Sequence, residues 1–370
     1  MTLHRLCFSV AVFIFFILTV TGYPAFAEPV SQESTAGQSD KTILNSIRFK
    51  GPITFCGNRV PIEQQQVRER LEKEMLLAAW NRPQVVLWLK RGARYFPHIE
   101  TILKSYGLPE DLKYIPVIES ALRPHPSSSK GAVGFWQFLR RTGKRYGLRI
   151  DTHVDERRNI FASTHAACKY LKDLNKRFDS YLLAISAYNM GEYALKKEIS
   201  AQKNNDFFSL YLPLQTQRYA FKIIAAKMIF ENQPRYGYYL DKKDLYPKFT
   251  FDRVNLDSGY QLPLTLIAES AGVPFKTIKD YNPELRGYYL DRGRYTILIP
   301  KGHAKGFKKK FDRAYAEWKK NNTRRIHIVK PGDSLIGIAH KYRMSLSRLL
   351  KLNNLSQKRV IHPGDRLIVD

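Results

Sequence analysis

The stretch that decides the fold begins at residue 119 and reads Glu119-Ser120-Ala121-Leu122-Arg123-Pro124, then, after three residues, Ser128-Ser129-Lys130-Gly131-Ala132-Val133-Gly134-Phe135-Trp136-Gln137-Phe138. On a helix, Glu119 would share one face with Leu112 and Ile115, and Pro116 would kink that helix. A carboxylate on an apolar stripe is costly as an anion and tends to stay protonated near neutral pH. A general acid for a glycosidic oxygen needs that property. A buried glutamate held by a hydroxyl or an arginine is the alternative.

The second half of this stretch combines glycines, aromatic residues and an amide. Gly131 and Gly134 allow the backbone to approach a helix or a ligand closely. The aromatic side chains at 135, 136 and 138 offer flat apolar surfaces, and Gln137 offers a donor and an acceptor. Sugars are bound by such mixtures. An aromatic cluster that serves only as core remains the alternative.

A third motif, Ala187-Tyr188-Asn189-Met190-Gly191, ends an apolar helical pattern that starts near Tyr181. The Tyr188 hydroxyl is positioned by this pattern to bond a buried carboxyl, and the Asn189 amide to bond a substrate amide. An ordinary helix end with a glycine cap explains the same residues without any function.

Taken together and in this order, the three motifs resemble those of lytic transglycosylases of the soluble-lytic-transglycosylase superfamily. The similarity extends over about residues 50–235 and includes the stretch from Asn159-Ile160 through 166–171. The flanking segments Phe55-Cys56-Gly57 and Trp80-Asn81-Arg82-Pro83 resemble membrane-bound lytic murein transglycosylase D proteins. The resemblance implies a mainly α, goose-type-lysozyme-like catalytic domain. It also implies cleavage of the MurNAc–GlcNAc β-1,4 bond of peptidoglycan with formation of a 1,6-anhydro-MurNAc end.

The resemblance assigns the chemistry to one carboxylate, where ordinary glycosidases use two. Glu119 is expected to protonate the leaving oxygen and then to act as base toward the C6 hydroxyl, while the substrate's N-acetyl group assists. The residues expected to bind substrate or to orient Glu119 are Ser120, Ser128, Gln137, Tyr188 and Asn189. Two positions depart from the family pattern: Pro126 replaces a frequent alanine, and Gln215 replaces a glutamate.

An internal repeat begins after about residue 248. At an offset of 71, Ile267 falls on Ile338, Asn282 on Asn353, and Ile297-Leu298 on Ile368-Val369. Each copy reads as strand, helix, helix, strand. The second copy resembles a glycan-binding LysM module, with Pro-Gly-Asp at 331–333 and 363–365. The first copy lacks Pro-Gly-Asp at both corresponding positions and is interpreted as a degenerate LysM module. For both copies, the alternative is a structural module that packs against the rest of the chain without binding glycan.

The charge balance and the N-terminus define the expected compartment. The 370 residues include 61 Lys and Arg against 33 Asp and Glu, a formal net charge of +28 that favours anionic partners. Residues 1–27 have the basic start, apolar run and small-residue cleavage pattern of a signal peptide. We therefore expect export to the periplasm or cell envelope and no nucleic-acid partner. Membrane association is expected only if the signal segment is retained.

The predicted fold is mainly α, with one degenerate and one intact βααβ module after the catalytic domain. Its domains are a signal peptide at 1–27, a flexible leader at 28–60, the catalytic domain at 61–247, a degenerate LysM-like module at 248–300, a basic linker at 301–325 and a LysM domain at 326–370. No strand is expected before residue 245.

The predicted partner is the peptidoglycan glycan strand, bound by a monomer without metal or cofactor, because no metal-ligand spacing appears. Cys56 and Cys168 are expected to be separate thiols, although the sequence leaves their pairing open. Two other functions stay open: a hydrolytic muramidase, and a non-catalytic peptidoglycan-binding protein.

Overall fold

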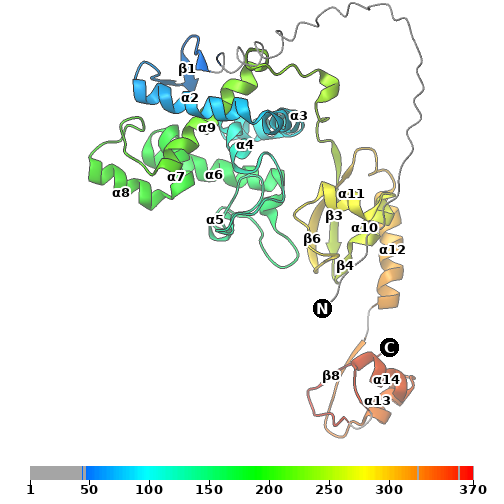
Figure 1. The fold of residues 1–370 in the computed structure, drawn as a ribbon. Helices are drawn as coiled ribbons and strands as arrows, with labels where there is room; N and C mark the ends of the chain where they lie inside the picture. The colour runs from blue at the N-terminus through cyan, green and yellow to red at the C-terminus, as the bar shows by residue number, and fades with distance from the viewer. Residues whose placement is uncertain (1–43, 45–46, 323–324, 357–358, 370) are drawn as a thin grey trace, which may run out of the picture. The chain divides into compact units, whose positions relative to one another are not determined.

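The computed structural model describes residues 44, 47–322, 325–356 and 359–369. The predicted signal peptide lies outside these residues, as does most of the predicted leader. Among the described residues, no helix has both the length and the apolar character needed to cross a membrane. The chain is mainly helical up to residue 247, which confirms the predicted fold class; the short strands gather toward the C-terminal end (Figure 1).

The first region combines one hairpin with a set of helices. Its elements are β1 (Ile53–Phe55), β2 (Asn58–Val60), α2 (Gln65–Trp80), α3 (Arg82–Ser105), η1 (Glu110–Tyr114), α4 (Ile115–Ser120), α5 (Arg140–Arg145), η2 (Glu156–Arg158), α6 (Ile160–Phe178), α7 (Tyr181–Met190), α8 (Glu192–Gln202), α9 (Leu214–Glu231), η3 (Gln233–Tyr236) and η4 (Lys242–Asp244). The two predicted helices on either side of Asn81 are confirmed, since α2 ends at Trp80 and α3 carries Pro83 in its first turn, where proline is tolerated.

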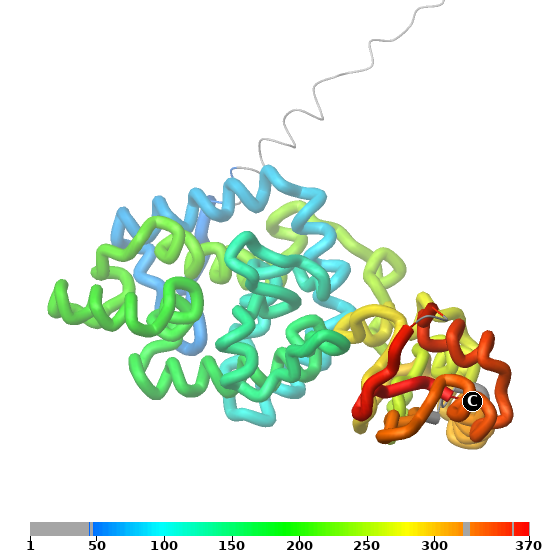
Figure 2. Tube along the Cα trace, turned by 90° about the horizontal axis from the view of Figure 1, so that it is seen from below, coloured from blue at the N-terminus to red at the C-terminus, as the bar shows by residue number. Residues whose placement is uncertain are grey.

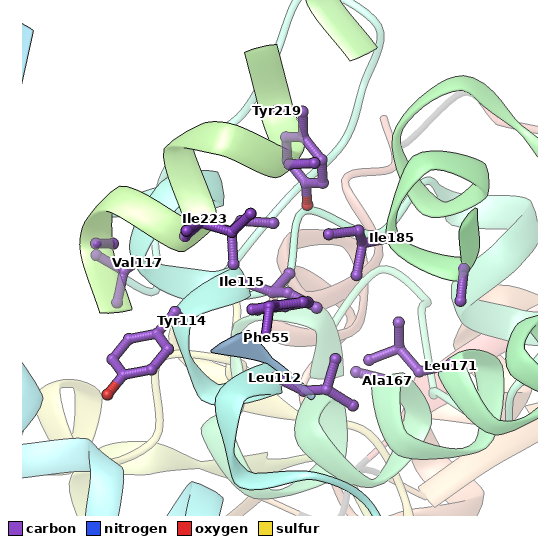
Figure 3. Close-up of a cluster of buried hydrophobic side chains, with 14 of the residues drawn as sticks. Phe55, Leu112, Tyr114, Ile115, Val117, Ala167, Leu171, Ile185, Tyr219 and Ile223 are labelled. Carbon is purple, nitrogen blue, oxygen red and sulfur yellow. The ribbon is translucent and has the colours of Figure 1, made fainter. Parts of the chain in front are cut away.

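The hairpin of β1 and β2 corrects two predictions: its residues, at the end of the predicted leader at 28–60, are folded, and strands do occur before residue 245. Cys56 and Gly57 form its turn with φ angles of 50° and 82°. Phe55 is fully buried, and Figure 3 shows it among helix side chains that include Leu112 and Ile115. The backbone N–H of Cys56 also donates to Asp111 Oδ2 at 2.7 Å. Burial of Phe55 therefore fixes the hairpin on the helices. This is a long-range contact, and the sequence of a three-residue strand does not predict it.

The segment around Pro116 is not a kinked helix. A 3₁₀-helix, η1, runs directly into the short helix α4, and Pro116 occupies the first turn of α4, where no backbone N–H is needed. Helix α4 ends after Ser120 because Ala121 and Leu122 both adopt left-handed conformations, with φ of 53° and 55°. Two such residues without glycine are uncommon and cluster at functional sites.

Helices α6, α7 and α9 each contribute several residues to the hydrophobic core. Asn159 caps α6 by accepting from the N–H groups of Phe161 and Ala162, and Ser180 caps α7 by accepting from Leu183. The helices from α2 to α9, blue to green in Figure 2, pack around one hydrophobic core. In Figure 3, Ala167 and Leu171 of α6 and Ile185 of α7 lie opposite Ile223 and Tyr219 of α9.

The first module follows η4 and contains more than the predicted strand–helix–helix–strand unit. Its elements are β3 (Phe251–Ser258), β4 (Leu262–Pro263), α10 (Leu264–Ala271), α11 (Phe275–Tyr281), β5 (Tyr289–Leu290), β6 (Gly293–Pro300) and α12 (Phe307–Asn322). Strands β3 and β6 pair antiparallel. Phe307 and Phe311 of α12 are buried in this module's core, so the segment predicted as a basic linker is largely a helix packed on α10.

The second module has β7 (Arg325–Ile328), α13 (Leu335–Lys341), α14 (Leu346–Asn353) and β8 (Arg366–Val369), with β7 and β8 antiparallel. The predicted repeat is visible in its asparagines. Asn282 bonds both backbone groups of Leu298, and Asn353 bonds both backbone groups of Ile368. The closing strands therefore correspond at an offset of 70, one residue less than the sequence alignment, which keeps the buried side chains on the core face.

Candidate active site

Glu119 lies near the end of α4, half-buried, with its carboxylate directed toward α9. The hydroxyl of Tyr219 donates to Oε1 of Glu119 at 2.6 Å. Burial raises the pKa of Glu119 to about 7, and the hydrogen bond from Tyr219 works in the opposite direction. A carboxyl with this pKa is protonated in about half of the molecules at pH 7.

The two carboxyl oxygens of Glu119 differ in their surroundings. Oε1 is occupied by the Tyr219 hydroxyl, whereas Oε2 has no hydrogen-bond partner among the described residues. Oε2 is therefore the oxygen able to carry a proton to an incoming group and to accept one afterwards.

Ser120 ties the catalytic helix to the loop that follows. Its Oγ lies 3.0 Å from the carbonyl oxygen of Pro116 and 2.9 Å from that of Phe135, and the residue is buried. The backbone N–H of Arg123 donates to the same Oγ at 3.3 Å. The hydroxyl is therefore used within the protein, and its role is to orient α4 against the 126–138 loop.

The 126–138 loop depends on Gly134. This residue has a φ of 85°, and a Cβ added to it would lie 1.8 Å from the carbonyl oxygen of Arg157. Its N–H donates to the carbonyl oxygen of Pro126 at 3.0 Å. Gln137, also left-handed with a φ of 49°, donates from Nε2 to Pro126 at 3.1 Å and to Gly134 at 2.9 Å. These bonds leave the Oε1 of Gln137 as its available acceptor.

Ser128 lies in the exposed part of the same loop. Its Oγ accepts from the N–H of Ala132 at 3.1 Å, and backbone bonds to Ala132 and from Gly131 close a tight turn. The hydroxyl shapes its own turn and remains open to solvent.

The aromatic residues of the loop are core. Phe135, Trp136 and Phe138 are each at most 2% exposed. The Trp136 Nε1–H donates to Thr164 Oγ1 of α6 at 2.9 Å. The interpretation of these rings as a sugar-binding surface is therefore wrong, and the core alternative holds, because the loop folds back and buries its own aromatic faces.

Tyr188 and Asn189 stand at the end of α7. The Tyr188 hydroxyl donates to the carbonyl oxygen of Trp136 at 2.6 Å, so it supports the loop, and Tyr219 supplies the carboxyl contact that the sequence suggested for Tyr188. Burial and then the Glu119 charge raise the pKa of Tyr188, so its ring lies close to the glutamate. Asn189 Oδ1 accepts from Thr216 Oγ1 at 3.1 Å, and its Nδ2 has no partner among the described residues.

Two functional features were missed at the sequence level. Tyr219 was not among the predicted site residues, although it lies only four positions after Gln215, in a segment already compared with the family pattern. The second is Arg157, buried and paired with Asp155 by bonds of 2.8 Å from Nε and Nη2. Its Nη1 also donates to the carbonyl oxygens of Gly131 and Phe138, at 3.0 and 3.1 Å, and so holds both ends of the glycine-rich turn.

Within the described ranges, no group of three or more His, Cys, Asp or Glu side chains is arranged to hold a metal ion. Cys56 and Cys168 are free thiols, and burial raises the pKa of both, that of Cys168 to about 12.

Comparison with known proteins identifies the family of this chain. Residues 97–210 match the family described as Transglycosylase SLT domain, 250–316 match the Lytic transglycosylase MltD, LysM-like domain, and 327–370 match the LysM domain. Over 332 residues the chain is 30% identical to the membrane-bound lytic murein transglycosylase D of Escherichia coli strain K12, covering 85% of this chain and 72% of that protein. The chain belongs to the lytic murein transglycosylase family.

Two further relatives are partial matches. The peptidoglycan transglycosylase gp16 of Escherichia phage T7 is 37% identical over 109 residues, 29% of this chain and 8% of that protein. The 70 kDa soluble lytic transglycosylase of Escherichia coli superposes with a TM-score of 0.34 and 15% identity, covering 48% of this chain and 33% of that one. Family membership makes this chain an enzyme, a lytic transglycosylase that carries LysM modules.

Proposed function

We propose that this transglycosylase cleaves the β-1,4 bond between MurNAc and GlcNAc in peptidoglycan and leaves a 1,6-anhydro-MurNAc end. The observation that carries the proposal is the single carboxyl of Glu119, with a pKa of about 7 and one oxygen, Oε2, that has no hydrogen-bond partner among the described residues. Among the described residues, burial raises this pKa and the Tyr219 hydroxyl lowers it, and no second carboxylate contributes to the shift.

The reaction follows in two proton transfers. Protonated Glu119 gives its Oε2 proton to the glycosidic oxygen while the bond from that oxygen to C1 of MurNAc breaks. The substrate's own N-acetyl group stabilises the positive charge at C1. The carboxylate then takes the proton of the C6 hydroxyl, and the C6 oxygen forms the new bond to C1. Glu119 ends protonated, ready for the next turnover.

The other predicted residues have separate roles in this proposal. Gln137 Oε1 and Asn189 Nδ2 offer an acceptor and a donor to the N-acetyl or hydroxyl groups of the sugar. Ser120 and Tyr188 orient α4 and the loop through bonds to Phe135 and Trp136. Ser128 meets the glycan from the exposed turn.

The modules and the charge support a wall-directed enzyme. The LysM module at 327–370 would hold the chain on peptidoglycan and raise the substrate concentration near Glu119. The net charge of +28 would add a weak, salt-sensitive attraction to carboxylates of the wall. We place the mature enzyme outside the cytoplasmic membrane, as a monomer, with the N-terminal segment removed or retained as an anchor.

The test is muropeptide analysis by mass spectrometry of purified sacculi digested with wild type and with Glu119→Gln. Anhydro-MurNAc ends from wild type and none from the variant are expected. Reducing MurNAc ends would identify the hydrolytic muramidase instead, and equal release by both proteins would remove Glu119 from the mechanism. The glutamine keeps the acceptor for Tyr219, so the variant should fold and still bind sacculi.

A further inference from the structure

The segment of residues 149–158, between α5 and α6, is shared between the catalytic domain and the first module. Ile150 and Asp155 pair in an antiparallel bridge, so the segment folds back on itself. Ile150 is buried in the hydrophobic core of the catalytic domain, whereas Val154 is buried in the core of the first module. One short segment therefore takes part in two cores.

A short antiparallel ladder fixes this segment to the part of the module between α11 and β5. Val154 lies at its centre, paired with a buried leucine of the module. On one side of this pair, the N–H of Arg286 donates to the carbonyl oxygen of His153 at 2.7 Å. On the other side, the N–H of Asp155 donates to the carbonyl oxygen of Glu284 at 2.8 Å. Backbone bonds around a buried pair fix the register of the contact and are costly to open.

The side chain of Glu284 adds a buried contact beside this ladder. Its Oε1 accepts from Asn159 Nδ2 at 2.8 Å, and the residue is 5% exposed. Its Oε2 is enclosed and has no partner among the described residues. Because the Oδ1 of Asn159 caps α6, the same amide joins the start of this helix to the module.

The same segment also carries Arg157, which holds the 126–138 loop. Its Nη1 donates to the two ends of the glycine-rich turn at 3.0 and 3.1 Å, and Asp155 fixes the guanidinium. The carbonyl oxygen of Arg157 also lies against Gly134, where a Cβ would not fit. The loop in turn carries two side chains to which substrate binding is assigned above. The module is thus connected to this loop through residues 153–159.

We propose that the first module is part of the framework of the active site, and that Glu284 is a positioning residue which holds the 126–138 loop in place through Asp155 and Asn159. This role is separate from any binding of glycan by the module. Its effect on substrate rests on the function proposed above, whereas the link between module and loop rests on the contacts alone. If the link were weakened, the loop would leave its binding position more often, while the bond between Tyr219 and Glu119 would remain.

Hydrogen–deuterium exchange of the full chain tests the link without any substrate. Glu284→Ala removes the acceptor for Asn159 and leaves the backbone ladder in place. Amides within 126–138 should exchange about 5- to 20-fold faster than in wild type, because a loop that has lost a buried hydrogen bond opens more often. Amides of α7 and α9 should exchange at the wild-type rate. Unchanged exchange in the loop, or an equal increase in these helices, would overturn the proposal.

Kinetics on short soluble glycan strands test the effect on substrate, because such strands leave wall binding out of the measurement. Glu284→Ala should raise KM about 5- to 20-fold and change kcat less than about 2-fold, since the loop binds substrate and Glu119 performs the chemistry. Glu269→Ala, which changes an exposed glutamate of α10 in the same module, should leave both constants and the loop exchange unchanged. A fall in kcat with unchanged KM would overturn the proposal. If wild type cut no strand, the proposed function would fail, and the exchange measurement would still decide the link.

Glu284→Gln distinguishes positioning from the mere presence of a side chain. Burial raises the pKa of Glu284 to about 7; the Asn159 bond and the Lys279 charge lower it, and the Glu156 charge raises it. The contribution of Glu284 to the contact is therefore fully present below pH 4.5, the ordinary value, and is lost as the pH rises through 7. Glutamine keeps the acceptor for Asn159 and resembles the protonated acid.

The expected result of this substitution is a change in the pH dependence of KM. The variant should match wild type at pH 5. Between pH 5 and 8.5 the KM of wild type should rise, whereas that of Glu284→Gln should rise less. Glu119 titrates in both proteins, so the difference between them reports Glu284. Identical KM profiles would overturn the assignment of Glu284 as a positioning residue.

Discussion

The hydroxyl of Tyr219 donates a hydrogen bond of 2.6 Å to Oε1 of Glu119 and joins α9 to α4. The bond favours the ionised glutamate, while burial favours the protonated one and prevails. The result is an acid that can also serve as a base near neutral pH. The bond further leaves Oε2 as the oxygen that would exchange protons with the substrate in the proposed reaction.

Replacing Tyr219 by phenylalanine should shift the pH dependence of cleavage. Without the hydroxyl, the pKa of Glu119 rises further above 7, because the bond that lowers it is gone. Activity that requires protonated Glu119 should then persist to higher pH, although its maximum should fall. The measurement is kcat/KM for release of anhydro-muropeptides between pH 5 and 9.

Tyr188→Phe is the matched control for this shift. The Tyr188 hydroxyl bonds the Trp136 carbonyl and makes no bond to Glu119. The variant should therefore lose activity, while the pH at which kcat/KM declines on the alkaline side stays nearly the same. An equal shift of this alkaline decline in both variants would refute the inference that the Tyr219 hydroxyl lowers the pKa of Glu119.

Glu119→Gln should stabilise the enzyme at high pH while it removes activity. The folded pKa of about 7 lies above the ordinary value of 4.5, so the folded chain binds more protons between these values. The contribution of this residue to the free energy of unfolding therefore falls, by at most about 3 kcal/mol, as the pH rises from 4.5 to 7. Above pH 7 it stays at this lower value. Thermal unfolding should show a higher Tm for the variant at pH 8 and a smaller difference at pH 5.

The exposed Glu269 provides the comparison, because its conversion to glutamine should leave Tm nearly unchanged at both pH values. A Glu119→Gln variant that was less stable than wild type at pH 8 would contradict the burial argument.

Gly134 and Gly131 should respond differently to alanine. Both have positive φ angles, 85° and 79°, but only the Gly134 Cβ would meet an atom, the Arg157 carbonyl oxygen at 1.8 Å. Gly131→Ala should therefore cost roughly 1–2 kcal/mol of stability through its backbone conformation alone. Gly134→Ala should cost several kcal/mol more or displace the loop, with loss of activity. Urea unfolding and turnover of glycan strands measure both, and similar effects would argue against the close contact.

The chemistry-bearing residues were more predictable from sequence than their contacts. Glu119 and the order of the three motifs are local features that can be read directly from the sequence, although the helix predicted before Glu119 is a 3₁₀-helix followed by the short α4. The hydroxyl of Tyr219 reaches Glu119 only because α9 packs on α4, a contact between segments a hundred residues apart. For the same reason the sequence could not show that Trp136 would be buried, or that Phe55 would anchor a hairpin in the core.

Asn353→Ala should separate wall binding from catalysis. Asn353 donates to the carbonyl oxygens of Leu349 and Ile368 and accepts from the Ile368 N–H at 2.6 Å, so it ties α14 to the closing strand β8. Alanine leaves these backbone groups unmet inside the small second module and costs it about 2–4 kcal/mol, enough to unfold it. Sedimentation with purified sacculi should show weaker binding, while cleavage of short soluble glycan strands by Glu119 should continue at the wild-type rate.

The equivalent change in the first module, Asn282→Ala, provides the comparison. Loss of sacculus binding from Asn353→Ala alone would assign glycan binding to the second module. Equal losses from both variants would assign it to both modules. If neither variant bound sacculi less than wild type, the modules would not be what holds the enzyme on the wall.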